Sequence, residues 1–154
     1  DMRVGLIKDG ASRLGIRIIT AMQNDASKFN AELPQADRVL CDVPCSGLGV
    51  IRRKPEIKFK SPSDFDGLPE IQYQILETSA RYVKPGGTLV YSTCTLSRAE
   101  NDEVAKRFAA AHPEFLPIVQ PVPYAGAAGD PTRTYCPDEN GGDGFFTASF
   151  RRVK

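Results

Sequence analysis

The 154-residue sequence has few of the residues on which common active sites and membrane anchors depend. It contains one histidine, four cysteines and no run that approaches the ~18 consecutive apolar residues of a membrane span. No signal peptide is visible. The cysteines lack the spacing of a disulfide framework, which predicts a protein of the reducing cytoplasm. With 41% hydrophobic residues and a formal net charge of +1, the composition is typical of one soluble globular domain.

The scarcity of histidine and the cysteine spacing weaken three familiar kinds of cysteine chemistry. A cysteine protease needs a Cys–His pair, but His112 stands at an expected helix end just before a proline. Cys41 and Cys45 do not have the spacing of a standard zinc-ligand pair, so we expect no metal site. Cys45 and Cys94 are a candidate redox pair, although they form no Cys-x-x-Cys motif. The remaining chemistry is a thiolate that adds to an electrophilic carbon.

One stretch, residues 39–55, is dense in reactive side chains. A short apolar run ends at Asp42, which predicts a buried strand with an acid at the carboxyl edge of the sheet, where ligands bind in open α/β folds. Pro44 directs the chain out of the sheet, and Gly47 and Gly49 permit a tight loop with inward-pointing N–H groups. We interpret the stretch as an active-site loop. The simpler interpretation is an acidic strand end beside a buried cysteine.

Positive charge follows this loop. Residues 52–60 contain five basic side chains and one acidic side chain. A run of this kind is usually a solvated face, but its position beside a candidate site favours contacts with nucleic acid. The candidate RNA-binding residues are Arg52, Arg53, Lys54 and Lys58.

Apolar periodicity predicts an α/β protein with a largely parallel, doubly wound sheet. The expected helices are 2–15, 68–83 and 97–111, the last opened by a capping box at 97–100, with a helical turn at 61–64. The expected strands are 16–21, 38–41, 88–93, 115–119 and 144–150, with a polar loop at 26–36 and a long surface loop at 121–143. If strands 38–41 and 88–93 are neighbours, Asp42, Cys45 and Cys94 converge on one crevice.

Four segments, in order, resemble motifs of the Nop/Sun family of RNA cytosine-C5 methyltransferases. Residues 42–49 followed by 53–56 are similar to its motif IV, and residues 84–95 are similar to its motif VI. Residues 100–103 resemble its acidic Asn-containing signature, and residues 143–146 resemble its C-terminal signature. The match covers nearly the whole chain. It implies a Rossmann-like fold that uses S-adenosylmethionine to methylate C5 of cytosine in RNA, with 16S ribosomal RNA as the expected substrate.

The resemblance also implies a role for each site residue. Cys94 is the expected nucleophile, adding to C6 of the base, and Cys45 assists breakdown of the covalent adduct after methyl transfer. Asp42 accepts a hydrogen bond from the cytosine amino group, which separates cytosine from uracil, and lies beside the methionine end of the cofactor. Asp25 is expected to contact the adenosyl group, and Pro44 completes the expected cofactor residues. The basic residues after the loop would hold RNA phosphates.

The family's Gly-rich cofactor loop, its ribose-binding acid and its N-terminal RNA-binding regions would precede residue 1. Residues 1–154 therefore resemble the C-terminal portion of a catalytic domain that lacks its first strands. We expect this fragment to be inactive by itself, not to bind S-adenosylmethionine at physiological concentration, and to self-associate through unpaired strand edges.

Two alternatives remain open. One is a non-catalytic RNA-binding module with a methyltransferase-like fold. The other is a DNA cytosine-C5 methyltransferase, in which the thiol of Pro44-Cys45 would be the nucleophile. The Thr93-Cys94 pair at the second strand end argues against the DNA enzyme.

Overall fold

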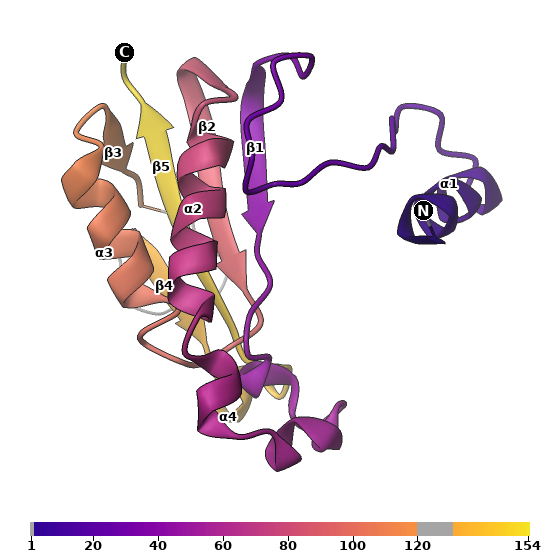
Figure 1. Ribbon diagram of the computed structural model, residues 1–154, viewed down its shortest axis with the longest axis vertical. Coiled ribbons are helices and arrows are strands. Elements are labelled where there is room, and N and C mark those ends of the chain that lie inside the picture. Colours follow the sequence, from indigo (N-terminus) through magenta and orange to yellow (C-terminus); the bar gives the residue numbers. More distant parts are fainter. Residues whose placement is uncertain (1, 120–130) are drawn as a thin grey trace.

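A mixed five-stranded sheet with two helices on one face organises the computed structural model, which describes residues 2–119 and 131–154 (Figure 1). The strands are β1 (Ala36–Asp42), β2 (Val83–Thr93), β3 (Phe115–Pro117), β4 (Thr132–Tyr135) and β5 (Phe145–Arg152). The α-helices are α1 (Met2–Arg13), α2 (Leu68–Ala80), α3 (Asp102–Ala111) and α4 (Pro137–Asn140), and short 3-10 helices span Leu48–Val50, Pro55–Phe59 and Pro62–Phe65.

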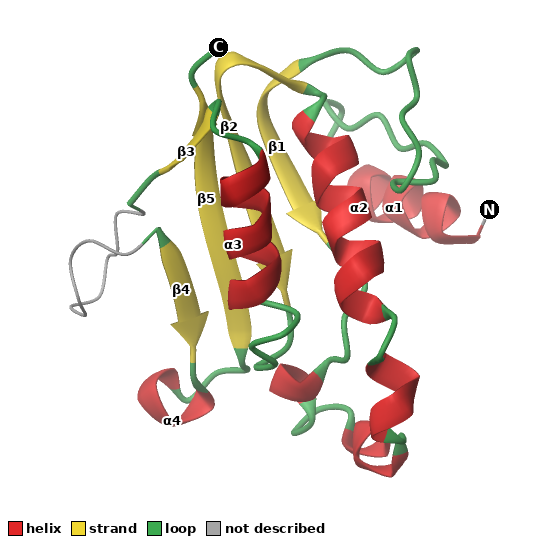
Figure 2. Ribbon diagram, turned by 60° about the vertical axis from the view of Figure 1, so that its left-hand side comes forward, coloured by secondary structure: helices red, strands yellow, loops and turns green. Residues whose placement is uncertain are grey.

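The strand order is β1-β2-β5, and β3 and β4 both pair with the far edge of β5. β1 and β2 run parallel, with Asp42 opposite Ser92, whereas β5 is antiparallel to β2, β3 and β4. The expected α/β class is confirmed. The sheet is mixed rather than largely parallel in this part of the chain, because β5 returns in the opposite direction between β2 and β3. Figure 2 shows α2 and α3 covering the same face, so these two helices do not form a doubly wound arrangement.

The core lies between that face and the two helices. Alternate residues of β2, Leu89, Tyr91 and Thr93, point into it and are fully buried, as the period-two geometry of a strand requires. Phe108 of α3 is also fully buried, with its ring centroid 5.4 Å from that of Phe115 and 5.1 Å from that of Phe150. Removing an aromatic side chain of this size from water contributes about 1.5–3 kcal/mol, so these contacts hold α3 against β3 and β5.

Most expected elements are confirmed with shifted ends. The structure contains the helix in residues 2–15, the turn near 61–64 and the strands near 38–41, 88–93, 115–119 and 144–150. The predicted helix over 68–83 ends at Ala80, because Val83 already pairs with β1 as part of β2. The predicted capping box at 97–100 is wrong: α3 begins at Asp102, and the side chain of Glu100 is buried against another loop. Ala111, at the end of α3, is exposed.

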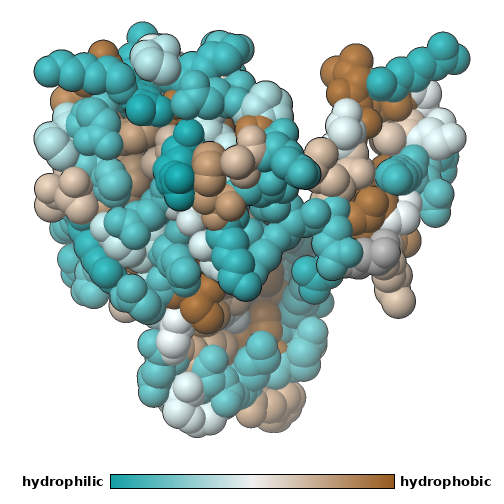
Figure 3. Space-filling model, turned by 45° about the horizontal axis from the view of Figure 1, so that its top comes forward, coloured by the Kyte–Doolittle hydropathy of each residue, from teal (hydrophilic) through white to brown (hydrophobic). Residues whose placement is uncertain are grey.

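The predicted strand at 16–21 is wrong. This segment is irregular, Ile18 is 95% exposed, and α1 before it has no buried residue. An apolar run becomes a strand only where a partner strand and a covering layer accept it, and the described residues offer neither here. Figure 1 shows α1 set apart from the sheet, and Figure 3 shows apolar side chains on the surface of that region.

β1 forms one edge of the sheet within the described residues, since its only strand partner there is β2. Leu40, on the face of β1 away from the helices, is 70% exposed.

Part of the long loop expected over 121–143 is a strand in the structure. Residues 121–130 lie outside the described residues, and residues 132–135 form β4 through pairing with β5. In the part of the chain that the structure describes, no helix combines the length and apolarity needed to cross a membrane.

Candidate active site

Two thiols meet at the carboxyl ends of β1 and β2. Cys45 follows β1 after a short turn and Cys94 directly follows β2, and their Sγ atoms are 3.2 Å apart. Both side chains are half-buried. The parallel pairing of β1 with β2 explains this convergence, because the carboxyl ends of two parallel neighbours lie at the same edge of a sheet.

The environment of Cys45 disfavours its thiolate. Burial is the largest cause that raises the pKa of Cys45 to about 12, followed by the hydrogen bond between Cys45 and Cys94. An ordinary cysteine has a pKa of about 8.5, so Cys45 keeps its proton at neutral pH. Burial also raises the pKa of Cys41 to about 11, and Cys41 lies inside β1 among core side chains. Cys41 is therefore a structural residue.

Backbone contacts fix the loop that carries Cys45. Gly47 has φ 74°, a left-handed conformation that favours glycine. The N–H of Gly49 donates to the carbonyl of Cys94 at 3.1 Å, and the N–H of Gly144 donates to the carbonyl of Gly49 at 2.7 Å. A Cβ on Gly49 would lie 2.1 Å from the Gly144 oxygen, so only glycine fits there. The loop is thus held between the end of β2 and the start of β5.

The expected cofactor residues are placed differently from one another. Asp42 ends β1 with an exposed side chain, and Pro44 is exposed in the turn that follows, with its carbonyl accepting a hydrogen bond from Gln72. Asp25 lies in the exposed segment between α1 and β1. Its carboxylate accepts hydrogen bonds from the Ser27 side chain and backbone, which lower its pKa together with Lys28. The structure thus brings Asp42 and Pro44 to the strand ends and uses Asp25 in a local turn.

The four basic candidates are all exposed, but two of them are engaged. Arg53 forms an ion pair with the largely buried Asp143, and Arg52 donates to the carbonyl of Gly141 at 3.2 Å. Lys54 and Lys58 have no side-chain partner among residues 2–119 and 131–154. The two arginines therefore tie the loop to the segment before β5, and the two lysines extend into solvent.

Sequence reasoning missed a buried polar network behind the thiols. Glu100 is 3% exposed, and its carboxylate accepts hydrogen bonds from the Ser46 N–H at 2.8 Å, the Ser46 hydroxyl at 2.6 Å and the Gln72 amide at 2.9 Å. The Ser46 and Thr95 hydroxyls are 2.7 Å apart. The available signal was the acidic Asn-containing segment at 100–103, but the capping-box pattern assigned Glu100 to a helix end.

The side chain of Asn101 forms hydrogen bonds with the residues on both sides of Cys94. Its side chain accepts a hydrogen bond from the Thr93 hydroxyl at 2.6 Å and donates to the Thr95 carbonyl at 3.0 Å. Asn101 is 1% exposed, so these bonds form away from competing water. The residues before and after Cys94 are therefore both held by one side chain.

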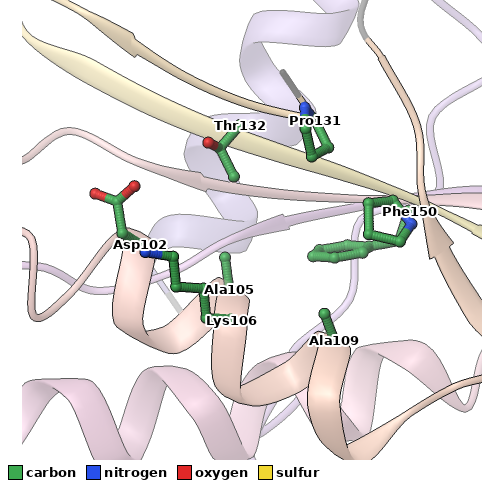
Figure 4. A pocket seen from close by; sticks show the side chains of 8 residues that line it. Asp102, Ala105, Lys106, Ala109, Pro131, Thr132 and Phe150 are labelled. Carbon is green, nitrogen blue, oxygen red and sulfur yellow. The ribbon is translucent and has the colours of Figure 1, made fainter. Parts of the chain in front are cut away.

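A hollow of about 250 Å³ lies elsewhere, between α3 and the β3–β4 side of the sheet. Figure 4 shows Asp102 and Lys106 of α3 on one side of it and Thr132 on the other. Neither cysteine lines it, so it is separate from the thiol pair. Among the described residues, no group of three or more His, Cys, Asp or Glu side chains is arranged to hold a metal ion.

Comparison with known proteins shows the family to which the chain belongs. The family described as 16S rRNA methyltransferase RsmB/F matches residues 1–151. The chain is 48% identical to a probable ribosomal RNA small subunit methyltransferase B of Bacillus subtilis, with 97% of the chain and 35% of that protein covered. It is 41% identical to ribosomal RNA small subunit methyltransferase B of Thermus thermophilus, with 93% of the chain and 35% of that protein covered.

A solved structure supports the same placement. The chain superposes on NSun6 from Pyrococcus horikoshii, solved with SFG, with a TM-score of 0.84 at 28% identity, covering the whole chain and 40% of that protein. This likeness confirms the expected Rossmann-like methyltransferase fold. The chain spans about a third of the length of the two curated relatives.

Proposed function

Because this chain belongs to the RsmB/F family of 16S rRNA methyltransferases, we propose that it forms the C-terminal portion of a catalytic domain that methylates C5 of a cytosine in small-subunit ribosomal RNA. The observation that carries the proposal is the pair of thiols at the carboxyl ends of β1 and β2, with Sγ atoms 3.2 Å apart. The donor of the methyl group is S-adenosylmethionine, and the location is the cytoplasm.

The proposed reaction uses both thiols in sequence. The Cys94 sulfur donates an electron pair to C6 of cytosine, and the electrons of the C5–C6 double bond make C5 nucleophilic. C5 then forms its bond to the methyl group that bound S-adenosylmethionine would supply, and the electron pair of the broken S–CH₃ bond would stay on the sulfur of the departing S-adenosylhomocysteine. In the last step a base removes the proton from C5, the C6–S bond breaks, and the C5–C6 double bond returns as the thiolate leaves. Cys45 assists this last step, since its sulfur lies within contact distance of the bond that breaks.

The protonation of Cys45 supports this division of roles. With a pKa near 12, Cys45 retains its proton at neutral pH and is a poor nucleophile. A protonated Cys45 donates its S–H hydrogen bond to a Cys94 thiolate across the 3.2 Å contact, which stabilises the charge on the attacking sulfur.

Asp42 supplies base discrimination in this proposal. Its exposed carboxylate ends β1 at the strand edge where both thiols lie, and it accepts a hydrogen bond from the amino group of cytosine. Uracil has a carbonyl at that position, so it would leave the carboxylate facing an acceptor, a mismatch that costs about 1–3 kcal/mol or more. Cytosine is therefore favoured over uracil.

The RNA contacts come from the surface beyond the loop. Lys54 and Lys58 extend into solvent and bind phosphates, and Arg52 and Arg53 add positive charge while holding the loop. Phe59 is 90% exposed beside Lys58, an arrangement that suits stacking with an unpaired base. Single-stranded RNA with splayed bases fits this surface.

The residues present fit one side of a cofactor site. Asp42 and Pro44 stand at the carboxyl end of β1, beside the thiols, where the methionine end of S-adenosylmethionine would be held. The related NSun6 structure contains SFG, an analogue of S-adenosylmethionine. When bound, the cofactor supplies an electrophilic methyl group. Asp25 is proposed to meet the adenosyl group once its present hydrogen bonds to Ser27 are exchanged.

The test is the release of tritium from C5-labelled cytosine by the full-length enzyme that contains this chain. RNA of the small subunit is expected to release tritium in proportion to methyl transfer, and a DNA strand of the same sequence is expected to release none. Release from DNA alone would identify a DNA methyltransferase. RNA binding without release from either substrate would identify a non-catalytic RNA-binding module.

A further inference from the structure

We infer that Glu100 is a positioning residue that, together with Asn101, holds Cys45 and Cys94 at reactive distance. The inference rests on the proposed function and adds to it a residue with no assigned role. Glu100 and Asn101 are consecutive, and each binds one of the two thiol-bearing segments. Their shared backbone therefore links segments that lie 49 residues apart along the chain.

The contacts of Glu100 lead directly to Cys45. Ser46 is the next residue after Cys45, and both its N–H and its hydroxyl donate to the Glu100 carboxylate, at 2.8 and 2.6 Å. The Gln72 amide of α2 donates to the same carboxylate at 2.9 Å and to the carbonyl of Pro44 at 2.9 Å. The residues on both sides of Cys45 are thus attached, directly or through Gln72, to one carboxylate.

The contacts of Asn101 do the same for Cys94. Asn101 bonds the Thr93 hydroxyl and the Thr95 carbonyl, the residues on both sides of Cys94. The 2.7 Å contact between the Ser46 and Thr95 hydroxyls then closes the link between the two segments. Each cysteine is held by its neighbours, and its own sulfur is left to react.

The electrostatics of Glu100 favour a functional role over a purely structural one. The carboxylate is 3% exposed, and within the described residues its hydrogen-bond donors are the neutral groups of Ser46 and Gln72, with no ion pair. Burying a carboxylate without a cation is costly, and a neutral side chain would fill the same volume at lower cost. The carboxylate is the group that can accept all three hydrogen bonds at once, because it has two acceptor oxygens and no donor.

The test compares Glu100→Gln with Glu103→Gln in the full-length enzyme. The two substitutions are chemically identical and three residues apart, but Glu103 is exposed. Glutamine at 100 places an NH₂ group against donors of Ser46 or Gln72, which displaces the Cys45 loop. Thr78→Val is a second control, since it removes a hydrogen bond from a largely buried hydroxyl to the Ser27 carbonyl and does not touch the thiol segments.

The first readout is the affinity of a trivalent arsenical that bridges two thiols, which reports the Cys45–Cys94 distance without any catalysis. Glu100→Gln is expected to weaken binding about tenfold, because a prearranged pair of ligands gains effective concentration that a displaced pair loses. Glu103→Gln and Thr78→Val are expected to bind as the unmodified enzyme does. Cys45→Ala, which leaves one thiol, defines the background.

The second readout is the rate of covalent adduct formation on RNA that carries fluorine at C5 of cytosine, which prevents the adduct from breaking down. A displacement of about 1 Å can cost on the order of 100-fold in rate, so Glu100→Gln is expected to slow adduct formation by about that factor. The Kd for RNA should stay within about twofold, because Glu100 is buried and does not reach the RNA surface. A failure of the proposed function would appear as no adduct in the unmodified enzyme, and the arsenical readout would still test the positioning role.

The inference is overturned if folded Glu100→Gln enzyme binds the arsenical and forms the adduct at unmodified levels. If Glu100→Gln lowers stability so far that the enzyme does not fold, Ser46→Ala decides the matter. That variant keeps the Ser46 N–H bond to Glu100 but loses the hydroxyl that contacts both Glu100 and Thr95. About a threefold loss in both readouts supports the inference, on the scale of one hydrogen bond, and no loss overturns it.

Discussion

Replacing each thiol in turn by alanine separates the nucleophile from its assistant. Cys94→Ala in the full-length enzyme is expected to stop methyl transfer and to prevent the covalent RNA adduct. Cys45→Ala is expected to slow attack only by the loss of the S–H hydrogen bond to Cys94, and to trap a stable protein–RNA adduct, because the assistance to its breakdown is gone. Cys136→Ala, which changes a cysteine outside the site, is the matched control and is expected to behave as the unmodified enzyme.

The size of the Cys94→Ala effect follows from the state of the remaining thiol. At pH 7.5 a thiol with a pKa of about 12 is ionised in roughly one molecule in 30,000, whereas an ordinary thiol with a pKa of about 8.5 is ionised in about one in ten. Burial is the largest cause of the raised pKa of Cys45, and burial persists when Cys94 is removed. Compared with an ordinary thiol, Cys45 would therefore attack more slowly by up to about three orders of magnitude on ionisation alone, since the contribution of Cys94 to the raised pKa is lost in this variant.

The assay is rapid quenching followed by a denaturing gel. RNA with fluorine at C5 of cytosine measures the rate of attack, and unmodified RNA measures accumulation of the natural adduct. Accumulation with Cys94→Ala and loss of the adduct with Cys45→Ala would reverse the two roles and refute the reasoning from ionisation.

Three further predictions concern charge, assembly and pH. Alanine at Lys54 and Lys58 should weaken RNA binding and flatten its dependence on salt by about 1.4 units of slope for two phosphate contacts on single-stranded RNA, measured by a salt titration; an unchanged slope would make the cluster a solvated face. The isolated 154-residue chain should show no binding of S-adenosylmethionine at physiological concentration by calorimetry and should self-associate by light scattering, because the outer edge of β1 is unpaired within the described residues; a monomer with micromolar affinity would contradict this. Burial raises the pKa of Cys41 in the folded chain to about 11, above the value of about 8.5 expected in the unfolded chain. The free energy of unfolding that this difference contributes is therefore complete below pH ~8.5 and is lost as the pH rises to about 11. Measured by urea unfolding, the decrease in the free energy of unfolding between pH ~8.5 and about 11 should be smaller in Cys41→Ala by about 3 kcal/mol. Equal decreases in the two proteins would contradict the prediction.

The sequence predicted those elements whose own residues decide their structure. The apolar run that ends at Asp42 and the run over 88–93 became parallel neighbours, which is why the convergence of Cys45 and Cys94 could be expected. The run at 16–21 has the same apolar character but no partner, and Ile18 remains exposed. The strand β4 shows the reverse case, because its residues lie within a polar stretch and pair only through β5. The pattern of apolar residues in a segment shows that it can form a strand, and the presence of a partner strand decides whether it does.

The site was predictable to the extent that its residues stand at strand ends. The positions of Asp42, Cys45 and Cys94 follow from strand order alone. The role of Glu100 could not be predicted, because its hydrogen bonds reach Ser46 and Gln72, 54 and 28 residues away along the chain. The ion pair of Arg53 with Asp143 could not be predicted for the same reason, because the two residues are far apart along the chain. Long-range polar contacts leave no periodic pattern in a sequence.

The position of β5 between β2 and the β3–β4 edge has a consequence for synthesis of the protein on the ribosome. Translation makes Cys45 and Cys94 well before residues 145–152. One edge of β2, the strand just before Cys94, pairs with those residues and has no strand partner until they emerge. Gly144, whose backbone fixes the thiol loop at Gly49, appears equally late. Pairing over such long separations in sequence is slow to form, so a nascent chain carries unplaced thiols and an open sheet edge until β5 has been made. The contact between Cys45 and Cys94 would thus be fixed only after β5 has been made.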